Sequence, residues 1–435
     1  MTGRKVLMNF DVTPTSHTLE AYLARGGYQT IQKVLREMKP AEVTAEVTAA
    51  GIQGRGGAAF PAGRKWQVVD PHDGLEHFLI ANADEGEPGT FKDRWVLEHT
   101  PHTLVESMLI AAYALAVRNC FVYIRGEFDR PYRHLAAAVE EAYAAGYLGE
   151  NIFGSGFSCH LYVFRGAGAY VCGEASSLLA SVEGSRGYPR NRPPRLTVKG
   201  LFQLPTVVNN VETLSNLTWI LQHGAAEYQK LGAPKSPGTR LISISGHITR
   251  PGTYEVEMGY PWSKFLEEDC GGILNGRKLK AIIPGGISSQ VLTPETIYKL
   301  NLDHYALWDV GSSLGSGGMI VIAEGTCMVS LLRVMLRFYH HESCGQCTPC
   351  RDGMGWANRV IDRMVAGQGK PGDIETLLHI STFNDGTTIC GLGDAAGYAT
   401  TAFIEHFRDE FEYIIEHKRS KYDGRLECLP EVANA

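Results

Sequence analysis

Three apolar runs, HFLIANAD (77–84), CFVYIRGEF (120–128) and CHLYVFRGAG (159–168), decide the fold of this chain. Each is short enough to form one buried strand, and helical patterning over Thr103–Arg118 and Pro131–Gly146 fills the two intervals between them. Strands that alternate with long helices predict an α/β domain with a largely parallel sheet. The first run ends in a polar turn, where α/β folds place ligand loops.

Other patterns flank this core on both sides. Residues up to about 50 show helical spacing, and residues 51–63 are dense in glycine. The segment 240–268 predicts two short strands around a Pro-Gly turn and then a helix, and AIIPGG (281–286) predicts a third strand. From Thr326 onward we expect four helices, at 328–339, 353–366, 372–382 and 395–417.

Length and composition indicate an ordinary globular protein. The 435 residues predict two to three domains, and 41 Lys and Arg against 47 Asp and Glu give a net charge of −6. This balance excludes a strongly basic nucleic-acid binder. The apolar stretch Leu104–Val117 contains Glu106 and is shorter than the roughly 20 residues of a membrane-spanning helix. The segment Met1–Asp11 lacks a secretory signal pattern, so we expect a cytoplasmic chain without direct membrane insertion.

Three cysteines near the C-terminus, Cys344, Cys347 and Cys350, form the spacing C-x2-C-x2-C, and Cys390 follows after 39 intervening residues. Thiolates at this spacing converge from one loop, and a distant fourth completes the four-thiolate set of an iron–sulfur cluster. A zinc site also takes four thiolates, but usually from two separated pairs. A structural or redox thiol role is the third alternative. We favour a [4Fe–4S] cluster and expect the other six cysteines to be small buried residues.

A glycine-rich run, GRGGAAFPAGRKW (54–66), precedes the first strand. Glycines let backbone N–H groups approach a phosphate or a flat ring, but the spacing is not the G-x-G-x-x-G of Rossmann loops, so a plain flexible loop is an alternative. The acidic run NADEGEPGTFKDR (82–94) offers groups for a heterocycle, or is a solvated turn. The run RGAGAYVCGEASSLLASVEG (165–184) predicts a helix whose N-terminus binds a phosphate, and Asn209 and Asn210 offer amides where another helix begins.

Taken together, NADEGEPGTFKDR, GAGAYVCGE (166–174), PTVVNNVETL (205–214) and HESCGQCTPCRDG (341–353) closely resemble the family of flavoprotein F subunits of NADH-quinone oxidoreductase, respiratory complex I. The resemblance covers nearly the whole chain. It implies an α/β FMN-binding domain with an inserted β-grasp (soluble-ligand-binding) domain and a C-terminal four-helix bundle that holds one [4Fe–4S] cluster. The implied domains are an N-terminal helical segment with the glycine-rich loop (1–70), the FMN- and nucleotide-binding domain (71–237), the β-grasp domain with a return strand (238–325) and the helical bundle (326–435).

The resemblance also implies the site residues. The positions that match FMN-holding residues of the family are Gly54, Gly56, Gly57, Lys65, Asn82, Asp84, Tyr170, Gly173, Glu174, Asn209, Asn210 and Thr213. Phe60 matches an aromatic residue that stacks on the nucleotide, and Glu87 matches an acid near the nicotinamide end. Cys344, Cys347, Cys350 and Cys390 match the cluster ligands. No general acid or base is expected, because the nicotinamide and the flavin carry the hydride chemistry.

The chain departs from the family pattern near the nucleotide. Ala175 follows Glu174 where the family has a second glutamate that faces the adenosine ribose. Val68 and Arg195 replace two family aromatics, and the glycine run reads GGAAFPAGR where GGAGFPTGL is usual. Because an acid that bonds the ribose selects NAD and an arginine accepts the phosphate of NADP, we hypothesise better tolerance of NADPH than in relatives. In two alternatives, Arg195 faces solvent and NADH remains the donor, or nucleotide binding is weaker altogether.

The implied function is that of an NADH dehydrogenase subunit, in which a hydride passes from NADH to FMN and single electrons leave through the [4Fe–4S] cluster. The implied partners are a thioredoxin-like [2Fe–2S] subunit and the large iron–sulfur subunit of a complex I-type assembly, peripheral on the cytoplasmic face of the inner membrane. Extensions typical of related hydrogenase subunits are not seen in the sequence, which favours complex I. The alternatives are a diaphorase subunit of a formate dehydrogenase and a scaffold subunit that no longer uses a nucleotide.

Overall fold

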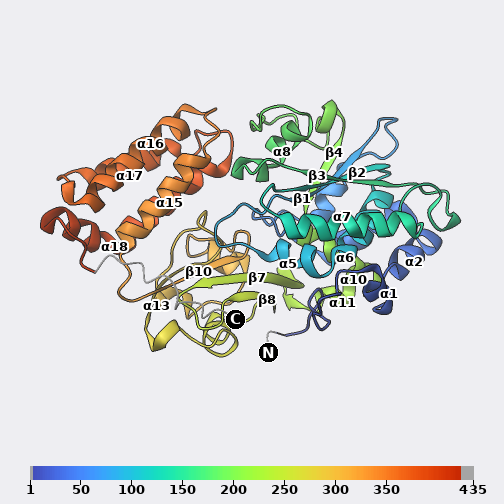
Figure 1. Cartoon of the computed structure of the whole chain (residues 1–435), viewed down its shortest axis with the longest axis horizontal. Helices are drawn as coiled ribbons and strands as arrows, with labels where there is room; N and C mark the ends of the chain where they lie inside the picture. Colours follow the sequence, from blue (N-terminus) through green and yellow to red (C-terminus); the bar gives the residue numbers. More distant parts are fainter. Residues whose placement is uncertain (1–2, 423–435) are drawn as a thin grey trace. The chain divides into compact units, whose positions relative to one another are not determined.

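The computed structural model describes residues 3–422, which form two compact units (Figure 1). The first unit contains the residues up to Gly86, then Thr90–Ile242 and Thr253–Tyr260. The second contains Glu87–Gly89, Ser243–Gly252 and the residues from Pro261 onward. The end of the predicted helical bundle, residues 423–435 with Cys428, lies outside the described residues.

A four-stranded sheet with the order β3-β2-β1-β4 forms the centre of the first unit. Its strands are β1 (Phe78–Ala83), β2 (Asn119–Ile124), β3 (His160–Arg165) and β4 (Thr206–Asn210), and every neighbouring pair is parallel. The three apolar runs are therefore strands of a parallel sheet, as predicted. In β1 only Asn82 is partly exposed, because a parallel sheet is covered on both faces and its strands are apolar throughout.

Helices pack around this sheet. They are α1 (Leu19–Ala24), α2 (Gln29–Glu37), α3 (Pro40–Ala50), α4 (Ala62–Trp66), α5 (Lys92–His99), α6 (Pro101–Ala114), α7 (Asp129–Ala144), α8 (Ala175–Val182), α9 (Val211–Ser215), α10 (Leu217–His223) and α11 (Ala225–Gln229). Helix α5 was not predicted, because its first residues belong to the polar run 82–94, which has the composition of a solvated turn. Lys92 and Asp93, at its start, are instead buried and paired with each other.

Helix α6 is a core helix, buried on nearly every face although it contains Glu106. The Glu106 carboxylate accepts hydrogen bonds from the backbone N–H groups of Tyr28 and Ile31, at 2.8 and 2.9 Å. Burial raises the pKa of Glu106, and these donors offset part of the cost of burying the carboxyl group. Between residues 3 and 422 the structure contains no helix of the length and apolarity that crossing a membrane requires.

A second sheet has the strand order β8-β7-β10-β9. Its strands are β7 (Thr239–Gly246), β8 (Gly252–Glu257), β9 (Leu279–Ile283) and β10 (Gly318–Ala323). Strand β10 is parallel to β7 and antiparallel to β9. The predicted strands on either side of Pro251-Gly252 and the third strand at AIIPGG are confirmed. Shorter elements are β5 (Gly232–Ala233), β6 (Ser236–Pro237), α12 (Trp262–Lys264), α13 (Pro294–Ile297) and α14 (His304–Trp308).

Four longer helices follow in the second unit, drawn in orange to red in Figure 1. They are α15 (Met328–Glu342), α16 (Thr348–Arg363), α17 (Asp373–Asn384) and α18 (Gly391–His417). Each packs on the next along the chain, and α18 also packs on α15. The four predicted helices are confirmed, but α16 begins at Thr348 rather than Gly353. Pro349 lies in its first turn, where a missing N–H costs no helical hydrogen bond.

Candidate functional site

The strand order places a topological switch point between β1 and β4. From β1 the chain continues to β2 and β3 on one side, and it returns on the other side of β1 as β4. Asn82 of β1 is in register with Asn210 of β4, so the two strands end at the same edge of the sheet. Ligands of open α/β sheets bind outside the carboxyl ends of the strands at such a point. This edge is therefore the candidate site.

The glycine-rich run forms a hydrogen-bonded loop beside β4. The Gly54 N–H donates to the Phe60 carbonyl oxygen at 3.0 Å. The Arg55 N–H donates to Thr213 Oγ1 at 2.8 Å, which holds the loop at the start of α9. Gly57 has a φ of +132° and open space where a side chain would lie. These bonds argue against a plain flexible loop and leave its backbone at Gly57 accessible to a ligand.

The carboxyl end of β1 contacts the turn that precedes α8. Asn82 Nδ2 donates to the Gly173 carbonyl oxygen at 2.9 Å, and Asn82 Oδ1 accepts from the Asp84 N–H at 3.0 Å. Tyr170 begins the same turn, and a Cβ atom at Gly173 would lie 3.4 Å from the Asp84 carbonyl oxygen. The structure thus brings together four of the residues that the resemblance assigned to FMN, from segments about 90 positions apart in the chain.

Two residues of α4 are held by the end of β4. Trp66 Nε1 donates to Asn209 Oδ1 at 3.0 Å, and Lys65 Nζ donates to the Val208 carbonyl oxygen at 2.9 Å. Burial, with the positive charge of Arg192 nearby, lowers the pKa of Lys65 to about 8. A lysine in this state is protonated at neutral pH and has little water around it, so an anionic group placed beside it is strongly attracted.

The N-terminus of α8 is occupied by the chain itself. Glu174 is the N-cap, and its Oε2 accepts hydrogen bonds from the Ser176 and Ser177 N–H groups at 2.8 and 3.1 Å. Its other carboxylate oxygen is 2.8 Å from the Arg192 guanidinium. The expectation that this helix start binds a phosphate is therefore wrong for these two N–H groups, because a side-chain carboxylate takes the place that an anion would need.

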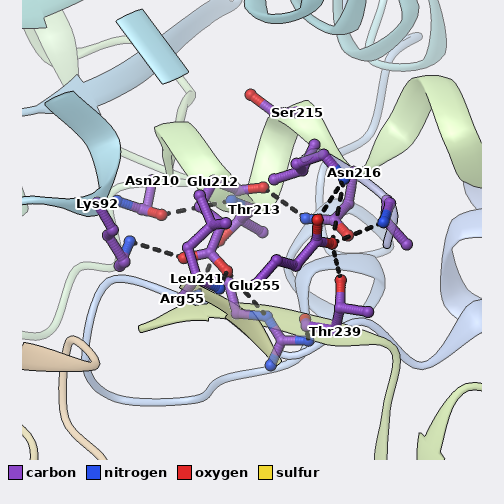
Figure 2. A network of polar contacts seen from close by, with 12 residues as sticks. Arg55, Lys92, Asn210, Glu212, Thr213, Ser215, Asn216, Thr239, Leu241 and Glu255 are labelled. Atoms are coloured by element: carbon purple, nitrogen blue, oxygen red, sulfur yellow. Dashed lines mark hydrogen bonds and ion pairs between the residues drawn. The ribbon is translucent and has the colours of Figure 1, made fainter. Parts of the chain in front are cut away.

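A charge network, here called the Glu212 network, adjoins the loop and consists of the buried residues Arg55, Lys92, Asp93 and Glu212 and the partly exposed Asn210. Figure 2 shows Arg55, Lys92, Asn210 and Glu212. Lys92 Nζ lies 2.8 Å from both Glu212 Oε2 and Asp93 Oδ1. Asp93 Oδ2 accepts from Asn210 Nδ2 at 2.6 Å, and Arg55 Nε lies 4.0 Å from Glu212 Oε1. Burial alone would lower the pKa of Lys92, but the carboxylates of Asp93, Glu212 and Glu85 raise it, so Lys92 is charged. The network fixes Asn210 and the glycine-rich loop.

Glu87 lies in the second unit, with the loop that follows β9. Its carboxylate accepts hydrogen bonds from the Ser288 N–H at 2.8 Å and from Ser288 Oγ at 2.6 Å. A Cβ atom at Gly286 would overlap the Glu87 side chain, so that glycine is required for this contact.

A cavity of about 750 Å³ opens in the first unit between the glycine-rich loop, α8 and β4. It is lined by Ala58, Phe60, Arg64, Lys65, Val68, Ala175, Arg192, Pro193, Arg195, Leu196, Thr197, Thr206 and Val208. Phe60 is 53% exposed, so its ring is available for stacking. The volume is within the range of small-molecule sites. Arg64 and Arg192 were not predicted for this site, although both stand inside runs rich in glycine or proline.

The four cysteines lie at the ends of the C-terminal helices. Cys347 is the N-cap of α16 and Cys390 is the N-cap of α18, so both thiols are placed at the positive ends of helix dipoles. Cys350 is buried in the first turn of α16, and burial raises the pKa of its thiol. The Ile389 N–H lies 3.4 Å from Cys347 Sγ and aims a donor at that sulfur. Gly345 has a φ of +82°, as the loop between the first two cysteines requires.

This donor set fits an iron–sulfur cluster, because four cysteine thiolates are the ligands that such a cluster takes. Two helix N-termini and a backbone donor near the sulfurs also favour a negatively charged group.

Two family models match the chain. Residues 47–219 match the family described as "Nuo51 FMN-binding domain", and residues 330–414 match the "NADH-ubiquinone oxidoreductase-F iron-sulfur binding region". The second F subunit of NADH-quinone oxidoreductase from Rhizobium meliloti is 45% identical over 96% of this chain and 99% of its own length. The corresponding F subunit of Rickettsia typhi is 43% identical over 92% of this chain and 95% of its own.

A solved structure is also similar. The NAD+-reducing [NiFe]-hydrogenase in the H2-reduced state has a chain that superposes with a TM-score of 0.80 and 34% sequence identity. The match covers 93% of the present chain and 67% of that chain.

Proposed function

The chain belongs to the family of F subunits of NADH-quinone oxidoreductase, and from this premise we propose how its residues carry the NADH dehydrogenase activity. Its cofactors are FMN and a [4Fe–4S] cluster, and its substrate is NADH. When bound, FMN accepts the hydride of NADH and, with the cluster, passes the electrons on singly. The observation that carries the proposal is the meeting of the glycine-rich loop with the ends of β1 and β4 at the switch point.

We assign the flavin to this edge of the sheet. The loop backbone at Gly57 approaches the flat ring or phosphate, and Lys65 supplies the positive charge that an anionic phosphate needs. Asn82 and Asn210 act as positioning residues, because their amides are bonded to Gly173 and Asp93. The remaining members of this proposed FMN set are Gly54, Gly56, Asp84, Tyr170, Gly173, Glu174, Asn209 and Thr213.

We assign the nicotinamide nucleotide to the 750 Å³ cavity. The exposed ring of Phe60 is the surface on which the nucleotide stacks. Glu87 remains our candidate for the acid near the nicotinamide end, held in place by Ser288. None of these residues transfers a proton in the proposal. They align the donor with the flavin and keep water away from the transfer.

We assign Cys344, Cys347, Cys350 and Cys390 as the cluster ligands, from which electrons leave the chain. Because its relatives are named as subunits, the chain works within a multi-subunit assembly. We propose that its partners there are a thioredoxin-like [2Fe–2S] subunit and the large iron–sulfur subunit, and that the assembly places it on the cytoplasmic face of the inner membrane. No nucleic acid and no direct membrane insertion enter this proposal.

We further propose the domain assignments implied by the sequence. The N-terminal helical segment with the glycine-rich loop (1–70) and the α/β domain (71–237) form the flavin and nucleotide part. The mixed sheet β8-β7-β10-β9 belongs to the β-grasp domain (238–325), and α15–α18 form the four-helix bundle (326–435). The intact flavin edge and cysteine set weigh against a scaffold subunit, and the relatives favour complex I over a formate dehydrogenase.

The test is anaerobic purification of the chain with its cofactors and a visible spectrum before and after NADH. We expect a flavin band that bleaches on addition of NADH. Lys65→Ala should lose flavin, while Lys33→Ala, an exposed lysine on α2, should retain it. A chain that holds no flavin, or flavin that stays oxidised with NADH, would contradict the proposal.

A further inference from the structure

The cavity assigned to the nucleotide carries an excess of positive charge. Among its lining residues are Arg64, Lys65, Arg192 and Arg195, and none is an aspartate or a glutamate. Two of the four cations already have a role: Lys65 donates to the Val208 carbonyl and is assigned to the flavin phosphate, and Arg192 is paired with Glu174. Within residues 3–422, the side chains of Arg64 and Arg195 make no hydrogen bond or ion pair. Two guanidinium groups are therefore available to a ligand.

The three residues that depart from the family pattern described above lie in the same cavity. Val68, Ala175 and Arg195 all line it, although they are far apart in the chain. Val68 is 52% exposed and Ala175 is the first residue of α8. Relative to the pattern that the resemblance implies, Arg195 places a positive charge where an aromatic ring is usual, and Ala175 provides no carboxylate. These three residues therefore affect the contacts with the ligand and not the packing of the core.

We propose that this cavity accepts a dinucleotide with a 2′-phosphate, so that NADPH serves as a hydride donor alongside NADH, with Arg195 and Arg64 as the partners of the extra phosphate. The inference rests on the proposed function, because the same flavin must accept the hydride from either donor. The inference extends the substrates of the proposed site from NADH to dinucleotides with a 2′-phosphate.

The chemistry of the two donors differs in one group. The ribose of NADH presents a 2′-hydroxyl, which NAD-dependent sites bond through a carboxylate, whereas NADPH presents a phosphate that carries negative charge. A carboxylate at position 175 would repel that phosphate, and Ala175 removes the repulsion. A guanidinium binds phosphate oxygens through two parallel hydrogen bonds. The cavity therefore lacks the group that rejects NADPH and has the group that binds it.

Other anion-binding groups near the cavity are already used. Glu174 takes the Ser176 and Ser177 N–H groups at the start of α8 and also neutralises Arg192. The extra phosphate is thus left with Arg64 and Arg195, both exposed to solvent. Because exposed charges are screened by salt, the advantage that they give to NADPH should fall as ionic strength rises.

Steady-state kinetics with both donors tests the proposal. We expect kcat/KM for NADPH to lie within about a hundredfold of that for NADH, and Arg195→Gln to lower the NADPH value about tenfold or more while changing the NADH value less than about threefold. Ala175→Glu should also lower kcat/KM for NADPH much more than kcat/KM for NADH, because its carboxylate repels the 2′-phosphate. Arg36→Gln on α2 is the matched control, an exposed arginine outside the cavity, and should change neither value. A preference for NADH above about a thousandfold, or an equal loss with both donors in Arg195→Gln, overturns the proposal.

Competition with nucleotide fragments separates recognition of the phosphate from hydride transfer. Adenosine 2′,5′-bisphosphate should inhibit NADH oxidation at lower concentration than 5′-AMP, and the difference should shrink in Arg195→Gln and at high salt. Equal inhibition by the two fragments contradicts the inference. If NADH bleaches the flavin and NADPH does not, the inference fails and the proposed function stands. If neither donor bleaches it, the proposed function itself fails.

Discussion

Replacing Lys92 by methionine should destabilise the first unit strongly, because Lys92 stands between two buried carboxylates. Its Nζ is 2.8 Å from both Asp93 Oδ1 and Glu212 Oε2, and all three side chains are almost fully buried. Lys92→Met has a similar length and no charge, so it leaves two negative groups facing each other. Two charge-assisted hydrogen bonds at about 1.5–3 kcal/mol each give a loss of about 3–6 kcal/mol. This value agrees with the general range for removing one partner of a buried ion pair in proteins, which is about 3–5 kcal/mol.

Urea unfolding followed by flavin release measures this loss, since FMN binds in the unit that holds Lys92. The matched control is Lys230→Met, which breaks the exposed pair of Lys230 and Glu227 and should leave the unfolding midpoint nearly unchanged, because water screens exposed ion pairs. Adding Glu212→Gln to Lys92→Met should recover part of the stability, because the double variant has one uncompensated charge fewer. A Lys92→Met protein within about 1 kcal/mol of the control would refute a charged, tightly coupled Glu212 network.

Three further outcomes are expected. Cys347→Ser should lose the absorption and electron paramagnetic resonance of the cluster, while Cys270→Ser, a buried cysteine outside the set, should keep both. FMN affinity of the apoprotein should fall as pH rises through about 8, because Lys65 is cationic below its pKa of about 8 and neutral above it; fluorescence titration of Lys65→Arg should show no such fall. Gly56→Ala brings a methyl group to 3.2 Å from Asn210 Cβ, so the same titration should show weaker FMN binding, and unchanged affinity would contradict the fit of the loop.

Most helices and strands of the fold could be predicted from local sequence patterns. The three apolar runs became β1, β2 and β3, and the C-x2-C-x2-C spacing marked the loop before α16, because strand burial and ligand spacing are properties of neighbouring residues. Helix α5 was missed for the converse reason. Its first residues, Lys92 and Asp93, are polar, and only residues far away in the chain make their burial favourable.

The candidate site was predicted unevenly. The glycine-rich loop and the asparagines were predicted because they stand in distinctive runs. The hydrogen-bond partners of the polar side chains were not predicted. Asn82 turned out to bond Gly173, and Glu174 turned out to cap α8. Hydrogen bonds between residues this far apart depend on the register of the strands and on the turns between elements, which no local pattern contains.

By itself, the sequence determined the parallel α/β core and the family, and it predicted the four cysteines that we assign to the cluster. It did so because these depend on apolar periodicity and on short motifs. Only the tertiary structure decided that Val68, Ala175 and Arg195 line one cavity with Phe60, and that Arg55, Lys92 and Glu212 form one buried network. The physical reason is that the electrostatic energy between two charges depends on their distance in space and not on their separation along the chain. The sign of a binding surface and the cost of a buried ion therefore depend on which residues the fold brings within a few ångströms of one another.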